Sequence, residues 1–175
     1  MGVLTMEYIF TLRYQWKGPD GETEHLIERL GAGGCDDALI GLGHPGRIAM
    51  EFSREAVDAE SAIRSALENV SAVSKDLHLI EVAPDLVGLT DAAEWVGISR
   101  QGMRKLMLSH WQTFPRPVHE GSVSIWHLAD ILSWFEARGG YSIDSRTSEI
   151  AELARRINLE NRIMRSSQPL DRLAL

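Results

Sequence analysis

Residues 6 to 16 alternate between apolar and polar side chains, and this alternation constrains the fold of the first half of the chain more than any other feature. The apolar set is Met6, Tyr8, Phe10, Leu12, Tyr14 and Trp16. Successive side chains of a strand point to opposite faces of a sheet. The segment is therefore predicted to be a strand with one buried face.

The segments that follow predict a β-α-β-β-α-β order. Thr23 is expected to cap a short helix that ends at Gly31, and Asp58 is expected to open a longer helix with one apolar stripe. Further strands are predicted at residues 38–42, 47–52 and 77–82. This order is typical of the ferredoxin-like arrangement, in which two helices cover one face of a four-stranded antiparallel sheet. Residues 83 to 85 are interpreted as a linker.

Composition excludes several classes of protein. With 44% hydrophobic and 25% charged residues, the chain has the composition of a globular protein and not that of a disordered or collagen-like one. Its apolar runs are too short for a membrane span, and no signal peptide is recognisable at the N-terminus. We therefore expect a cytoplasmic protein. The single cysteine, Cys35, excludes a disulfide scaffold and argues against a zinc site.

The net charge of -7 is unevenly distributed. Residues 1 to 85 hold 7 basic and 15 acidic side chains, whereas residues 86 to 141 hold 5 of each. Residues 142 to 175 hold 6 basic and 5 acidic side chains. The acidity therefore belongs to the first half and does not argue against a nucleic-acid partner for the second half.

The stretch from Thr90 to Arg138 predicts a winged helix-turn-helix. Thr90 is expected to cap a first helix, Gly97 supplies a turn, and Ser99 caps a second helix that runs to about residue 108. Residues 114–119 and 122–126 are expected to form a hairpin, and residues 127–138 a third helix. Helix, turn, helix, hairpin and helix in this order define the winged motif.

These residues resemble the excisionase and AlpA-type branch of the MerR-like DNA-binding families. The resemblance rests on Leu89-Thr90, Gly97-Ile98-Ser99-Arg100, the Phe114-Pro115 wing and the Trp-bearing last helix that includes Trp126, Asp130 and Trp134. It covers roughly 50 of the 175 residues. It implies that residues 99 to 105 lie in the major groove of double-stranded DNA and that the 116–124 hairpin reaches the backbone or the minor groove.

Roles at this interface follow from side-chain chemistry. Arg100, Gln101 and Arg104 are predicted to read bases, since Arg pairs with guanine and Gln with adenine. Phosphate contacts are predicted for Lys105 and Arg116, and weaker contacts for Ser99, Ser122 and Ser124; His119 lies on the wing near the DNA. The alternative is that the polar residues of the second helix form only a solvated face.

Other residue types favour structural interpretations. Four tryptophans (Trp95, Trp111, Trp126 and Trp134) are expected in the core, as are Met103 and Met107. The six histidines lack metal-ligand spacing, so no metal site is predicted. Acidic neighbours are expected to raise the pKa of Cys35, which argues against a nucleophile. With no acid, base or nucleophile set, we expect neither enzymatic activity nor a cofactor.

A last helix is predicted from Ser148 to about Arg165, followed by loose residues 166 to 175. Its apolar stripe consists of Ile150, Leu153, Ile157 and Met164. The helix either folds back on its own domain or pairs two subunits, as related MerR-like regulators use a terminal helix. Two copies of the module would give the affinity that a regulator needs, so a homodimer is expected.

The sequence therefore predicts an α+β protein that binds DNA as a transcriptional regulator. Residues 1–83 would form a ferredoxin-like unit for a small effector, a protein partner or self-association, residues 86–141 the winged unit, and residues 142–175 the C-terminal helix and tail. Two alternatives stay open. One is an antitoxin-type interaction protein that regulates its own gene, and the other is an excisionase-like factor that bends DNA.

Overall fold

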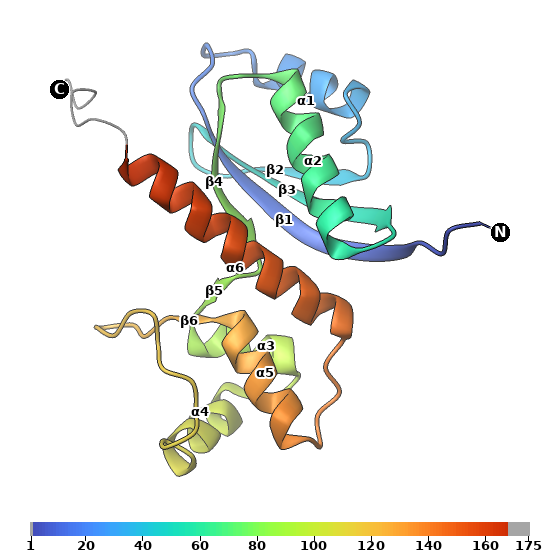
Figure 1. Cartoon of the computed structure of the whole chain (residues 1–175). Helices are drawn as coiled ribbons and strands as arrows, with labels where there is room; N and C mark the ends of the chain where they lie inside the picture. Colours follow the sequence, from blue (N-terminus) through green and yellow to red (C-terminus); the bar gives the residue numbers. More distant parts are fainter. Residues whose placement is uncertain (1, 168–175) are drawn as a thin grey trace.

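Four antiparallel strands form the sheet of the N-terminal half in the computed structural model, which describes residues 2 to 167. The strands are β1 (Met6–Trp16), β2 (Ala38–Leu42), β3 (Arg47–Ala56) and β4 (Leu77–Ala83), and their order in the sheet is β2-β3-β1-β4. Helix α1 (Thr23–Ala32) connects β1 to β2, and α2 (Ala59–Val73) connects β3 to β4 (Figure 1). All four strands lie where the sequence predicted them.

One face of the sheet is buried because the apolar residues of β1 and β3 alternate in the same register. Leu12 lies opposite Met50, and the rings of Phe10 and Phe52 stack with their centroids 5.3 Å apart. Helix α2 begins where expected: Asp58 accepts a hydrogen bond from the Ser61 N–H at 2.7 Å. The apolar stripe of α2 then packs on the buried face of the sheet.

The second half contains three short helices and a two-stranded sheet. The elements are β5 (Leu86–Val87), α3 (Leu89–Val96), α4 (Arg100–Ser109), β6 (Trp126–His127) and α5 (Leu128–Arg138). Gly97 joins α3 to α4 with φ +80°, a left-handed conformation that glycine adopts without a steric penalty. Phe135, Leu132 and Met103 are completely or almost completely buried in this second core.

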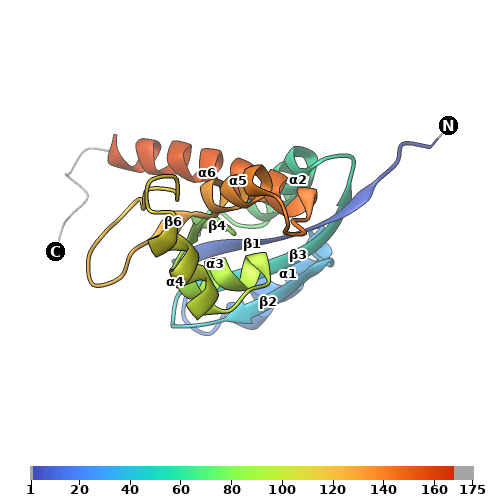
Figure 2. The same cartoon turned by 90° about the horizontal axis from the view of Figure 1, so that it is seen from below.

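Helix α6 (Ser145–Ser166) lies across both halves (Figures 1 and 2). Ile150, Leu153 and Ala154 belong to the core of the sheet, whereas Ala151 belongs to the core of the second half. The helix therefore folds back on its own chain and contributes to two cores at once. Met164, predicted for the buried stripe, is instead 64% exposed and borders an open hollow beside β4.

Three predicted helix starts are wrong. Asp144, not Ser148, caps α6 by accepting from the Arg146 N–H at 2.9 Å. Thr90 and Thr23 lie inside their helices, whose caps are residues 88 and 22 with no side-chain hydrogen bond. Helix α1 also passes Gly31 and ends at Ala32.

The predicted hairpin is reduced to one bridge, between His119 and Ile125. Trp126 pairs with Val87 instead and so joins β6 to β5. Of the tail that was expected to be loose, Ser166 ends α6 and Ser167 follows it as the C-cap residue. Residues 168 to 175 lie outside the described part of the chain. Within residues 2 to 167, no helix combines the length and apolar character that crossing a membrane requires.

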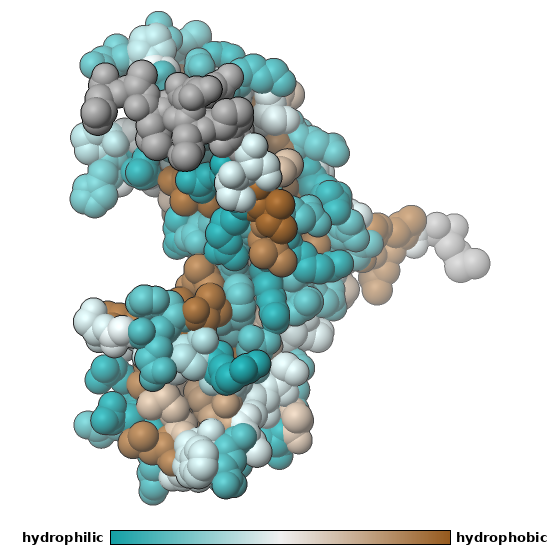
Figure 3. Space-filling model, turned by 60° about the vertical axis from the view of Figure 1, so that its left-hand side comes forward, coloured by the Kyte–Doolittle hydropathy of each residue, from teal (hydrophilic) through white to brown (hydrophobic). Residues whose placement is uncertain are grey.

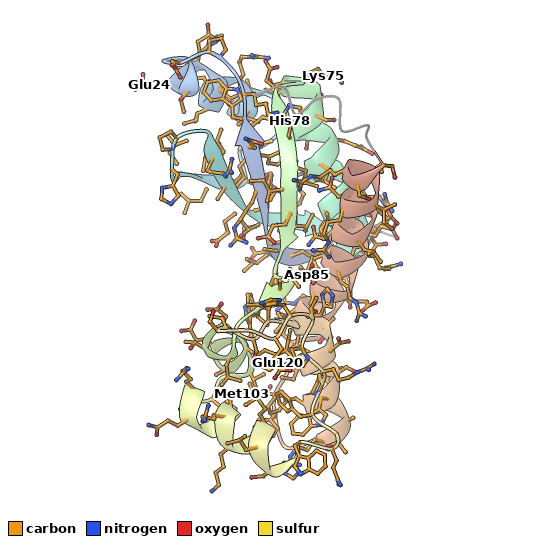
Figure 4. All side chains as sticks on the ribbon, turned by 90° about the vertical axis from the view of Figure 1, so that its left-hand side faces the viewer. Glu24, Lys75, His78, Asp85, Met103 and Glu120 are labelled. Carbon is orange, nitrogen blue, oxygen red and sulfur yellow. The ribbon has the colours of Figure 1, made fainter. Side chains whose placement is uncertain are left out.

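The segment interpreted as a linker is part of the packed structure. Asp85 is 1% exposed, and its Oδ1 lies 2.6 Å from His127 Nδ1 at the start of α5. Its Oδ2 accepts a hydrogen bond from the side-chain amide of Asn158 on α6 at 2.8 Å. Figure 4 shows Asp85 at the junction of the two halves. A single buried carboxylate therefore connects the sheet, the second half and α6.

Candidate nucleic-acid interface

Helix α4 is fixed by one cap and one buried anchor. The side chain of Ser99 accepts a hydrogen bond from the Gly102 N–H at 3.0 Å, as the sequence predicted. Met103 is fully buried, and Met107 is partly buried beside it. Because the inner side of the helix is held in this way, its opposite side faces solvent in a fixed orientation.

The exposed side of α4 carries the residues predicted to read DNA. Arg100, Gln101, Arg104 and Lys105 are all exposed. Among the residues that the structure describes, none forms a salt bridge with the three cations of this set. Their donors are therefore available to an external acceptor such as a phosphate or a base edge.

A groove of about 380 Å³ is lined both by two of these arginines and by the loop that the sequence predicts to be the wing. Arg100 and Arg104 line it from α4, and the loop of residues 122 to 124 lines it from the opposite side. Ser122 and Ser124 line the same groove as the two arginines. Asp91 of α3 also borders the groove and is the acidic group there.

Arg116 is not brought to this groove. It lines a separate hollow of about 620 Å³ with Thr113, Ser133 and Trp134, on the side that faces α5. His119 is exposed and stands at the base of the wing, where it forms the bridge to Ile125. The phosphate contact predicted for Arg116 therefore requires DNA that extends around this side of the second half.

Two of the four tryptophans hold the wing against α5. The Trp126 Nε1–H donates to the Pro115 carbonyl at 3.0 Å, and the Trp134 Nε1–H donates to Thr113 Oγ1 at 3.3 Å. Phe114 lies between these rings, with centroid distances of 6.2 Å and 5.2 Å. Their interpretation as core residues is confirmed for Trp126, and Trp134 is partly buried.

The prediction that Trp95 and Trp111 are buried is wrong. Trp111 is 73% exposed just after α4, and Trp95 is 44% exposed on α3. The periodicity of α3 contains a signal for this result, because Ala92, Ala93 and Val96 form its buried stripe and Trp95 lies outside it. The hydrophobic character of tryptophan outweighed that positional signal in the prediction.

Trp95 lies instead where the uncovered face of the sheet meets α3. It lines a groove of about 350 Å³ and a neighbouring one of about 240 Å³, and Ile9 of β1 lines both. The first groove also contains the ion pair of Arg13 with Glu81, whose atoms are 2.5 Å apart. Figure 3 shows the molecule as two lobes with a notch between them.

Arg54 is a buried cation that the sequence prediction missed. It is 8% exposed, and its guanidinium donates to both carboxylate oxygens of Asp37 at 2.7 and 2.8 Å. It also donates to Asn69 Oδ1 at 2.9 Å and to the Gly34 carbonyl at 2.7 Å. All its partners are internal, so this network holds the loop before β2 against α2. Continued alternation after Phe52 places Arg54 on the buried face and could have revealed it.

Cys35 is a buried free thiol. Burial raises the pKa of the Cys35 thiol, Arg54 opposes this rise, and Asp37 and Asp36 add to it. The predicted direction is therefore correct, although burial contributes more than the acidic neighbours. Between residues 2 and 167, no three His, Cys, Asp or Glu side chains are grouped in a way that could hold a metal ion.

Compared with models of known protein families and with curated protein sequences, the chain matches none.

Proposed function

We propose that this protein is a sequence-specific DNA-binding transcription regulator of the MerR-like, AlpA-type winged helix-turn-helix class. In this proposal residues 1–83 form a ferredoxin-like unit, residues 86–141 the winged unit, and residues 142–175 the C-terminal helix and tail. The strand order β2-β3-β1-β4 with helices on one face supports the first assignment. The sequence α3, Gly97, α4, wing loop and α5 supports the second.

The observation that carries the proposal is the pair of exposed arginines beside the wing. Arg100 and Arg104 have no acidic partner in a described salt bridge, and they border one groove with the loop of residues 122 to 124. An arginine can donate two parallel hydrogen bonds to O6 and N7 of guanine in the major groove. Gln101 offers the matching pair for adenine, and Lys105 offers a point charge for phosphate.

The overall negative charge is compatible with this proposal. The excess of acidic side chains lies in residues 1 to 85, whereas α4 belongs to a segment with equal numbers of basic and acidic residues. Surface charges separated by more than about 8 to 10 Å are largely screened at physiological salt. The local charge of α4 therefore matters more for contact with DNA than the net charge of the chain.

Selection of bound fragments from random and genomic DNA tests the proposal directly. A regulator enriches a defined site, and its affinity for that site exceeds its non-specific affinity by about 10³ or more. Uniform recovery of fragments, with affinity that depends only on salt, would contradict sequence-specific recognition.

Single substitutions on α4 then test the assigned roles. Arg100→Ala and Arg104→Ala should each cost about 1 to 3 kcal/mol of binding free energy and relax the preference at particular base pairs. Lys105→Ala should weaken all sequences alike and reduce the salt slope by about 1. Arg64→Ala is the matched control, because Arg64 is an exposed arginine on α2, in the N-terminal half. Equal binding by the α4 variants and the control would remove the assignment.

A further inference from the structure

The two edge strands of the four-stranded sheet differ in whether another element covers their outer backbone groups. At the β4 edge, Asn158 of α6 accepts from the Val82 N–H at 2.7 Å and donates to the Val82 carbonyl at 2.8 Å. One turn further, the Asn161 side chain donates to the Leu79 carbonyl at 3.1 Å. These amides take the place of a neighbouring strand, so α6 closes this edge against further pairing.

The β2 edge has no such cover among the described residues, where β2 is the last strand of the sheet. Its five residues, Ala38 to Leu42, include no charge and no proline. Leu39 is 75% exposed and Leu42 is 55% exposed. Edge strands that stay unpaired usually carry charged residues, proline or a bulge, because unpaired backbone groups attract another strand. The composition of β2 is that of a strand that pairs.

The backbone of β2 presents its outward groups at alternate residues. The Asp37 carbonyl accepts from the Ser53 N–H and the Arg47 carbonyl accepts from the Gly43 N–H, so odd-numbered residues of this segment bond toward β3. In an antiparallel ladder the intervening residues face the other way. Ile40 and Leu42 therefore direct their N–H and C=O groups outward. Ala38 directs its carbonyl outward, while its N–H bonds to the Cys35 carbonyl.

We propose that β2 pairs with β2 of a second copy of this chain, antiparallel and centred on Ile40, so that the two sheets become one. In this register Ile40 exchanges both hydrogen bonds with Ile40 of the partner subunit. The Leu42 N–H donates to the carbonyl of Ala38 of the partner subunit. The two-fold symmetry of the pair repeats this bond at the other end of the strands. This pairing gives an interface for the homodimer that the sequence predicts, but it rests on β2 alone and does not require DNA.

In this register β2 is complementary to a second β2, which favours a second copy of this chain as the partner of the strand. Leu39 lies opposite Gly41 of the partner subunit, where a missing side chain leaves room: even an added Cβ at Gly41 would meet no atom closer than 3.9 Å. The exposed Asp36 and His44 lie in the turns that flank β2, so this register brings each close to the other residue of the partner subunit. A carboxylate and an imidazole are complementary as charges or as hydrogen-bonding groups.

Sedimentation equilibrium of the full chain tests the interface. The wild-type protein is expected to be a dimer. Ile40→Pro removes an outward N–H and leaves the bonds to β3 intact, and Leu39→Lys adds a charge at an exposed position. Each variant should raise the dimer dissociation constant by about tenfold or more. Leu159→Lys is the matched control, because Leu159 is 53% exposed on α6, and this variant should remain dimeric.

A charge exchange tests the register. His44→Glu alone should weaken the dimer because it places a carboxylate near Asp36 of the partner subunit, and adding Asp36→Lys should restore it. Circular dichroism of each variant confirms that it is folded. A monomeric wild-type chain, or full dimerisation of Ile40→Pro and Leu39→Lys, would overturn the proposal. Loss of dimerisation by Leu159→Lys alone would assign the interface to α6 and overturn it as well.

The outcomes are separable from the proposed function. A monomer that still selects a DNA site refutes only the β2 interface. If the wild-type chain is a dimer that the β2 substitutions dissociate, but it selects no DNA site, only DNA recognition is refuted.

Discussion

Replacing Asn158 by leucine should destabilise the protein strongly. The side chain is 2% exposed and makes hydrogen bonds to the Val82 N–H, the Val82 carbonyl and Asp85 Oδ2. Leucine has a similar volume but leaves these three groups unpaired and away from water. Each unsatisfied buried polar group costs about 1 to 3 kcal/mol, so three of them cost about 3 to 9 kcal/mol. That is a large fraction of the stability of an ordinary domain.

Urea unfolding measures this cost, with Asn161→Leu as the matched control. Asn161 is one turn further along α6 and only partly buried, and its bond to Leu79 is 3.1 Å long. Water can replace that bond, so the control should lose about 1 kcal/mol or less. The midpoint of unfolding should therefore fall much further for Asn158→Leu at an unchanged slope. Equal midpoints for the two variants would refute the reasoning that Asn158 satisfies a buried edge.

Three further predictions concern the N-terminal half. Arg54→Met should lower the unfolding free energy in urea by about 3 to 5 kcal/mol because it leaves the Asp37 carboxylate without its buried partner, whereas the exposed Arg64→Met should leave stability nearly unchanged. The cap bond from the Ser61 backbone lowers the pKa of Asp58 below its ordinary 3.8. The ionised cap therefore stabilises the fold at pH values above 3.8, and this stabilisation is lost as the pH falls through the lowered pKa. Unfolding free energies of Asp58→Asn should be less sensitive to acid than those of the wild type. Cys35 should react slowly with a thiol reagent at neutral pH and rapidly in urea, because burial raises its pKa; rapid reaction of the folded chain would contradict this.

Elements with local determinants were predictable from sequence. The alternation of β1 and the cap of α2 at Asp58 depend on residues a few positions apart, and both predictions are confirmed. The same holds for the exposed face of α4, because Ser99 and Met103 fix that helix within one turn. These residues carry enough information in their own spacing to specify their surroundings.

Features that depend on distant partners were not predictable in this way. Thr90 is a good capping residue, but the two-residue pairing of β5 with β6 brings the chain into α3 earlier. The sequence indicates a linker at Asp85, because its hydrogen-bond partner Asn158 lies 73 positions away. The predicted hairpin is reduced to the bridge between His119 and Ile125, and Arg116 lines a hollow with residues of α5. In each case tertiary contacts outweigh local preference.

The position of α6 has a consequence for synthesis of the chain. Ile150 and Ala151 are neighbours in sequence, yet they complete two different cores. While the ribosome is still translating the residues before them, the cores of both halves lack the side chains that α6 adds to them. Neither half therefore reaches its final packing until this one segment has left the exit tunnel.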